Sequence, residues 1–205
     1  MISFYRLNPL SLVQICTPIL ERFQDKDEAL KFIEKIGEKV KSNSEAFALT
    51  KVLQGKIQLD CFNNVEKTKV SLSRYIFGLL RRIPYKFDGV LLYDTLHMIL
   101  LQALIEELEV LINEIDRVGF VHGQFYMLAS RFYMKEGIHA DYYRASLHFL
   151  GCTELNTLAK EDRIDQAFKL SLAALLGKDI FNFGELLAHP ILDDLKGTDK
   201  VFICF

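Results

Sequence analysis

The sequence lacks features that define several classes of protein. It has four cysteines and no C-x-x-C pair, so their spacing indicates neither a zinc site nor a disulfide framework. We therefore expect reduced, mostly buried thiols and an intracellular protein. Positive charge is not in surplus either, since 25 Lys and Arg face 27 Asp and Glu and give a net charge of -2. Nucleic acids and anionic membranes attract proteins with a surplus of Lys and Arg, so we expect neither as a partner.

Long apolar runs are also missing. The most apolar region, about residues 90–105, is interrupted by Asp94 and His97 and is followed by two glutamates. Its uncharged stretch is shorter than the roughly 20 apolar residues that cross a bilayer. The first six residues contain no charged stretch that leads into a long apolar run, so we expect no secretory signal.

Recognised catalytic motifs are absent as well. The sequence contains no G-x-S-x-G, G-x-x-x-x-G-K-[ST], G-x-G-x-x-G or H-E-x-x-H. The closest candidate is His139 with Asp141, with His122, His148 and Glu136 further away, because His and carboxylates bind metals. The more common role of such a pair is a helix start, where the carboxylate complements the helix dipole and the imidazole is solvated. We expect no enzyme, no cofactor, no small-molecule substrate, and no catalytic or metal-binding residue.

The pattern that is present is helical. Apolar residues recur at intervals of three and four through most of the chain, and half of all residues are hydrophobic. Short polar links between such segments predict an all-α protein of stacked antiparallel hairpins, in which each pair buries its apolar face against its neighbours. The predicted helices cover residues 10–23, 27–41, 44–59, 103–115, 121–135, 139–149 and 161–176, with two short helical pieces flanking His189 and Pro190.

Helix boundaries carry recognisable signals. Asn8 followed by Pro9 predicts a helix start, because Asn caps free backbone N–H groups and Pro suits the first helical position. Residues 42–45, Ser-Asn-Ser-Glu, have the spacing of a capping box. Glycines are predicted to end or separate helices at three places, Gly119, Gly137 and Gly177.

Two groups of aromatic and apolar residues have two interpretations each. The first group forms either a stacking platform for a ligand or, as is more common, the interior of a helical hairpin; it contains Tyr126, Phe132, Tyr133, Tyr142, Tyr143 and Phe149. The second group packs between successive helices or anchors a neighbouring subunit, and packing within the chain is the more common use. It supplies our candidate partner-binding residues, which are Phe181, Phe183, Leu186 and Leu187.

Several segments, in order, resemble one family, the 26S proteasome non-ATPase regulatory subunit 13. They are residues 8–13, 32–35, 38–42, 139–152 (HADYYRASLHFLGC), 179–187 (DIFNFGELL) and 189–192. The resemblance implies a right-handed, tetratricopeptide-like α-solenoid that acts as a non-catalytic structural subunit of the regulatory particle lid. It also implies other lid subunits as partners, a role in ubiquitin-dependent protein degradation, and a place in cytoplasm and nucleus. An adaptor of the signalosome or of a translation-initiation complex is the alternative, and a metal-dependent enzyme using His139 and Asp141 is the second alternative.

The resemblance has gaps. It covers roughly residues 5–61 and 102–200, so we treat residues 1–205 as one helical-repeat domain with an unmatched insertion at 69–102 and an unmatched tail at 201–205. The insertion is either translated intron or a genuine extra loop or helix, and residues 91–101 have a pattern that would extend the following helix backward. The family's winged-helix module is expected to be absent, as in a truncated isoform.

Overall fold

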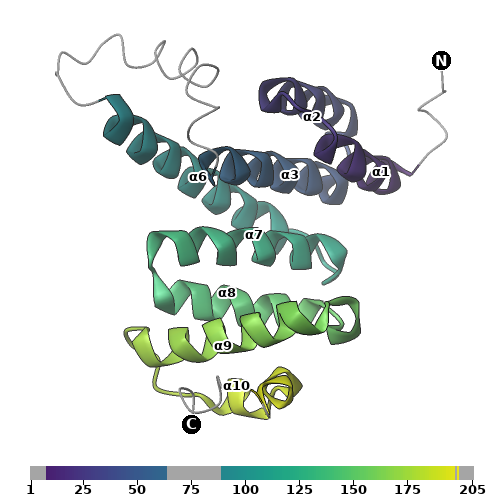
Figure 1. Cartoon of the computed structure of the whole chain (residues 1–205). Coiled ribbons are helices and arrows are strands. Elements are labelled where there is room, and N and C mark those ends of the chain that lie inside the picture. Colours follow the sequence, from purple (N-terminus) through teal and green to yellow (C-terminus); the bar gives the residue numbers. More distant parts are fainter. Residues whose placement is uncertain (1–7, 64–88, 197, 199–205) are drawn as a thin grey trace. The chain divides into compact units, whose positions relative to one another are not determined.

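The chain is helical throughout its described parts (Figure 1). The structure is a computed structural model that describes residues 8–63, 89–196 and 198, and the side chains at 61–63 and 89–95 lie outside that description. Within these ranges every regular element is an α-helix or a 3-10 helix, which confirms the all-α class. The residues divide into two compact units, 1–116 and 117–205.

The described residues of the first unit form four long helices. They are α1 (Pro9–Glu21), α2 (Lys26–Val40), α3 (Ser44–Asn63) and α6 (Gly89–Asn113). Helix α3 is central, because α1, α2 and α6 all pack against it. Because α6 begins at Gly89, residues 91–101 do extend the following helix backward. Residues 69–88 of the expected insertion, and the expected tail at 201–205, lie outside the described residues. In the part of the chain that is described, no helix has the length and apolar character that crossing a membrane requires.

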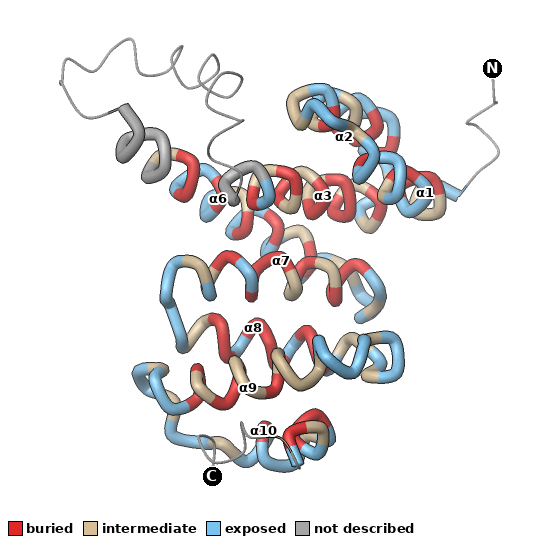
Figure 2. The backbone as a smooth tube through the Cα atoms, viewed as in Figure 1, coloured by how far each residue is buried: buried red, intermediate tan, exposed pale blue. Residues whose placement is uncertain are grey.

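Caps fix where the first two helices begin. The Asn8 side-chain oxygen accepts a hydrogen bond of 3.0 Å from the N–H of Leu10, and Pro9 occupies the first helical position, as predicted. Asp25 does the same for α2 by accepting from the N–H of Asp27 at 2.9 Å. The buried face of α2 comprises Ala29, Ile33, Ile36, Gly37 and Val40, while its Lys and Glu residues face outward (Figure 2).

The capping box predicted at residues 42–45 is wrong in detail. Asn43, not Ser42, caps α3, since its side-chain oxygen accepts a hydrogen bond of 2.8 Å from the N–H of Ala46. The N–H of Phe47 then donates to the carbonyl of Asn43, which starts the helix. Asn is at least as good a cap as Ser, so neighbouring candidates compete and the sequence alone places the start only to within a residue.

A small residue lets α2 approach α3 closely. A Cβ atom at Gly37 would lie 3.2 Å from the Thr50 side-chain oxygen. Thr50 is buried, and its hydroxyl donates to the carbonyl of Phe47 at 2.7 Å. Position 37 is therefore a point where the helix spacing requires glycine or a shift of the neighbouring side chain.

The second unit stacks three helices and ends in short pieces (Figure 1). Its elements are α7 (Phe120–Glu136), α8 (His139–Cys152), η2 (Leu155–Thr157), α9 (Lys160–Leu176), α10 (Gly184–Ala188) and η3 (Pro190–Leu195). Helix α7 packs on α8, α8 on α9, and α9 on η3. The two short pieces on either side of His189, α10 and η3, match the prediction.

The α7–α8 turn contains the predicted glycine. Gly137 has φ 72°, and its N–H and that of Ile138 donate to the carbonyls of Met134 and Tyr133 at the end of α7. Gly119 has a different role from the one predicted. Helix α6 ends at Asn113, and Gly119 precedes α7 in an extended conformation, where its N–H donates to Nδ1 of His122 at 3.3 Å.

Replacing Gly137 with Ala should destabilise the second unit by about 1 to 2 kcal/mol, because a Cβ atom is strained at positive φ. Gly151→Ala is the matched control. Gly151 lies in α8 with no described atom within 4 Å of the added carbon, so we expect that change to stabilise by up to about 1 kcal/mol. Thermal unfolding followed by circular dichroism measures both. Equal effects of the two substitutions would contradict the left-handed turn.

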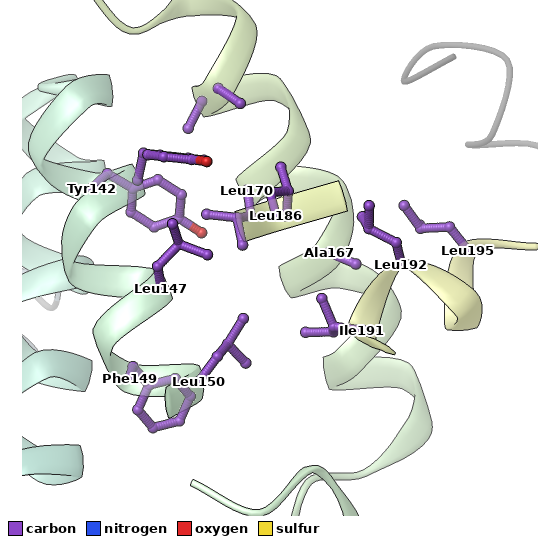
Figure 3. Packing of buried hydrophobic residues seen from close by; sticks show 13 residues of the cluster. Tyr142, Leu147, Phe149, Leu150, Ala167, Leu170, Leu186, Ile191, Leu192 and Leu195 are labelled. Carbon is purple, nitrogen blue, oxygen red and sulfur yellow. The ribbon is translucent and has the colours of Figure 1, made fainter. Parts of the chain in front are cut away.

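Aromatic residues fill the interior of the second unit. Phe132, Tyr142, Tyr143 and Phe149 are buried, and Tyr126 and Tyr133 pack at the edge of the same core. This confirms the interpretation of the group as a hairpin interior. A cluster of buried residues joins α8, α9, α10 and η3, and its labelled residues point toward one another in Figure 3. Burial of these apolar side chains stabilises the packing of α10 and η3 against α9.

Candidate functional site

The residues of the hypothetical metal site have separate local roles. His139 is exposed at the first position of α8. Asp141 lies in the first turn and forms an ion pair with Arg144 at 2.9 Å, which agrees with the interpretation as a helix start. His148 is exposed and stacks on the ring of Tyr126, with 4.9 Å between ring centroids. Among the described residues, no three His, Cys, Asp or Glu side chains come close enough to hold a metal ion.

The thiols that the structure describes are protected rather than activated. Burial raises the pKa of both Cys16 and Cys152 above the ordinary thiol value. A raised pKa keeps the sulfur protonated at neutral pH, and the thiolate is the reactive form. These positions therefore do not have the properties of a catalytic nucleophile.

The loop between α9 and α10, residues 177–183, has a tightly defined backbone. Helix α9 ends at Gly177 as predicted, where a Cβ atom would overlap the side chain of Ile180 and lie 2.8 Å from the carbonyl of Ala173. Asp179 has φ 62°, a left-handed conformation that is uncommon for a residue other than glycine. The Asn182 side chain then accepts from the N–H of Gly184 at 2.9 Å and starts α10. The backbone of the loop is therefore fixed, and with it the positions from which its side chains extend.

The structure divides the four candidate partner-binding residues into two pairs. Leu186 is 4% exposed within the core cluster, and Phe183 packs against that cluster from its edge. Phe181 is 86% exposed and Leu187 is 61% exposed. Half of the segment thus joins the helices of this chain, and half is directed toward solvent.

The exposed pair has apolar neighbours that the sequence analysis did not select. Leu175 and Leu176, at the end of α9, are 62% and 60% exposed. Met134 and Ile138 are also exposed, and they lie at the α7–α8 turn, which is at the same edge of the unit as the end of α9 (Figure 1). The helical pattern did not mark the two leucines, because consecutive residues of one helix can both be covered, as Ala173 and Ala174 are. We call these five exposed residues, which lie at the ends of α7 and α9 and in the loops that follow them, the apolar edge: Met134, Ile138, Leu175, Leu176 and Phe181.

Large contiguous apolar surfaces often mark sites that another protein covers, so the apolar edge is a candidate for such a contact. The five residues of the edge carry no ionisable side chain, and the titratable groups with shifted pKa values in this unit include Tyr143 and His189, which are not part of the edge. Burial raises the pKa of Tyr143 and lowers that of His189. The chemistry this surface offers is therefore binding rather than proton transfer.

Comparisons with known proteins support a structural role. The family model described as PSD13 N-terminal repeats matches residues 3–77 and 95–204. The unmatched interval, 78–94, falls inside the expected insertion, and the match continues into the expected tail, so the predicted boundaries at 69–102 and 201–205 stay predictions.

Curated relatives carry related names. The 26S proteasome non-ATPase regulatory subunit 13 of Dictyostelium discoideum is 29% identical, across 94% of this chain and 42% of its own length. Homolog B from Arabidopsis thaliana is 27% identical, across 95% of this chain and 43% of its own. The regulatory subunit RPN9 of Saccharomyces cerevisiae is 28% identical, across 94% and 44%. The chain thus spans less than half the length of these relatives, and because the family model matches most of its residues, it belongs to the PSD13 N-terminal repeat family.

Proposed function

We propose that this chain is a non-catalytic structural component of the 26S proteasome regulatory particle lid and acts in ubiquitin-dependent protein degradation by binding other lid subunits. The observation that carries the proposal is the match of the family model to both units. The relatives from Dictyostelium discoideum and Arabidopsis thaliana are named as non-ATPase regulatory subunits, which agrees with a role in assembly rather than in chemistry. Cytoplasm and nucleus are the corresponding locations, and nucleic acid, membranes and small-molecule substrates are not part of the proposal.

The alternatives have less support. An adaptor of the signalosome or of a translation-initiation complex would share the helical architecture, yet the curated relatives named above are proteasome subunits. A metal-dependent enzyme would need His139 and Asp141 to act together, but the Asp141 carboxylate is paired with Arg144 and His139 is exposed. The handedness of the stack and its likeness to tetratricopeptide repeats remain predictions from the resemblance.

We further propose that the apolar edge, with Phe181 as its anchor, contributes a contact to a neighbouring subunit. A loop whose backbone is already fixed loses little backbone freedom when the exposed aromatic side chain that it carries enters a pocket. Aromatic anchors of this kind carry much of the binding free energy at protein interfaces. Leu187, which is also exposed, is the second candidate contact.

Co-purification tests both parts of the proposal. The full chain, tagged and expressed in cells, should capture lid subunits, which quantitative mass spectrometry measures. Phe181→Asp should reduce that capture about tenfold or more, because it removes an anchor and buries a charge. Ile15→Asp, an equally polar change at an exposed position of α1, should leave capture unchanged.

The possible results separate the two claims. If the unmodified chain captures no lid subunit while remaining folded, the proposed function is wrong. If Phe181→Asp and the unmodified chain capture lid subunits equally, the function stands and the apolar edge is not the contact. Thermal unfolding of each variant verifies that the substitutions leave the fold intact.

A further inference from the structure

In the described part of the second unit, short helical pieces rather than a full helix follow α9. Helix α9 presents a face of small and apolar residues that includes Ala167 and Leu170, both fully buried. The residues that cover it come from α10 and η3 and are seen around α9 in Figure 3: Leu186, Ile191, Leu192 and Leu195. We call α10 and η3 together the closing segment. Its two pieces have five and six residues, too few for independent helical stability, so contact with α9 must hold them.

One titratable residue, His189, joins the two pieces. It follows the last residue of α10, and its own N–H donates to the carbonyl of Leu186 at 3.0 Å. Its Nδ1 accepts a hydrogen bond of 3.2 Å from the N–H of Ile191, the residue that lies fully buried against α9. Pro190 between them has no N–H to donate. The imidazole therefore caps η3 at the point where the chain turns toward the core.

This hydrogen bond requires a neutral imidazole. A nitrogen that accepts must carry a free lone pair, whereas both nitrogens of the protonated ring carry hydrogen and can only donate. Protonation would place an N–H opposite the N–H of Ile191 and leave that buried donor without its acceptor. We propose that His189 is a protonation-sensitive latch that holds the closing segment against α9 when neutral and releases it when charged.

The charged groups around His189 affect how readily its imidazole takes up a proton. In α10, the carboxylate of Glu185 attracts a proton to His189 and therefore opposes the neutral form that closes the latch. The other acidic groups nearby are engaged, because Asp193 pairs with Lys196 and Asp194 pairs with Arg163 of α9. Burial outweighs Glu185, so the pKa of His189 lies below the ordinary value of about 6.5.

The sign of the pH effect follows from that lowered pKa. Above about pH 6.5 the imidazole is neutral whether the segment is closed or open, and the full stabilisation is present. As the pH falls below that value, the open form binds the proton more readily than the closed form, so the equilibrium shifts toward opening. Opening would uncover the apolar face of α9, which is the kind of surface that another protein or another helix covers in a stacked array.

Hydrogen exchange of the full chain, measured by mass spectrometry at pH 7.4 and pH 5.5 and expressed as protection factors, tests the latch. We expect peptides from residues 184–195 to lose protection about fivefold more than peptides from α2 and α3, which contain no histidine, since one cap contributes about that much. His189→Asn keeps an acceptor that does not titrate, so its protection should stay the same at both values. Glu185→Gln removes the carboxylate that favours the charged ring in the closed form, so the loss of protection at pH 5.5 should be larger than in the unmodified chain.

Two outcomes would overturn the latch. The first is a loss of protection in His189→Asn equal to that of the unmodified chain, because another group would then be responsible. The second is unchanged protection of residues 184–195 in the unmodified chain at pH 5.5. Peptides from α2 and α3 are the internal reference, since these helices contain no histidine and none of the variants alters them.

Discussion

Replacing Leu170 with Ala should lower the free energy of unfolding of the second unit by about 2 to 5 kcal/mol. Leu170 is fully buried at the centre of α9, within the cluster that joins α8 to the closing segment. Removing three carbons there costs transfer free energy and leaves a cavity that the neighbouring helices can fill only in part. Chemical denaturation followed by circular dichroism gives the change directly.

Leu175→Ala in the same helix is the matched control. It removes the same atoms from a side chain that is 62% exposed, so we expect a change within about 0.5 kcal/mol. Equal losses at the two positions would mean that the second unit packs differently from the arrangement in Figure 3. An unchanged denaturation midpoint for Leu170→Ala would also contradict that packing.

Asp194→Asn should also destabilise the second unit, by about 1 to 3 kcal/mol, because it removes a charge-assisted pair that is mostly shielded from water. Asp194 accepts a hydrogen bond of 3.2 Å from Nη2 of Arg163, and its second carboxylate oxygen forms an ion pair with Nε at 2.9 Å. Both side chains are only about one-fifth exposed, at 20% and 21%. The same guanidinium donates to the carbonyl of Leu155 at 3.2 Å and so connects η2, α9 and η3.

The neighbouring residue provides the control. Asp193 pairs with Lys196 at 2.6 Å, but both side chains are largely exposed, so Asp193→Asn should change little. A double-mutant cycle with Arg163→Met isolates the coupling of Asp194 to Arg163 from other effects of each change. A coupling energy near zero would show that the pair contributes nothing beyond the packing around it.

Local features explain why much of the fold was predictable. The caps at Asn8 and Gly137 act within a few residues, so the sequence contains both partners of each interaction. The buried face of α2 follows from its spacing of three and four residues in the same way. Errors arose where nearby residues compete for one role, as at Ser42 and Asn43, or where a glycine can end one helix or precede the next, as at Gly119.

The candidate site was predictable only in part. The segment from Phe181 to Leu187 was selected for its apolar residues, but the separation of Phe181 from Leu186 depends on how the loop turns. Leu175 and Leu176 were not selected, although they lie in a predicted helix, because the pattern of a helix does not say which of its apolar groups a neighbour covers.

By itself, the sequence determined the helical class, most helix boundaries and the resemblance to one family, since each depends on interactions or motifs that are close along the chain. The tertiary structure decided which leucines of α9 are covered, that Arg163 pairs with a residue 31 positions away, and that His189 caps the segment closing the second unit. These outcomes depend on the distances between helices, and contacts between residues far apart in sequence are fixed only when the helices pack.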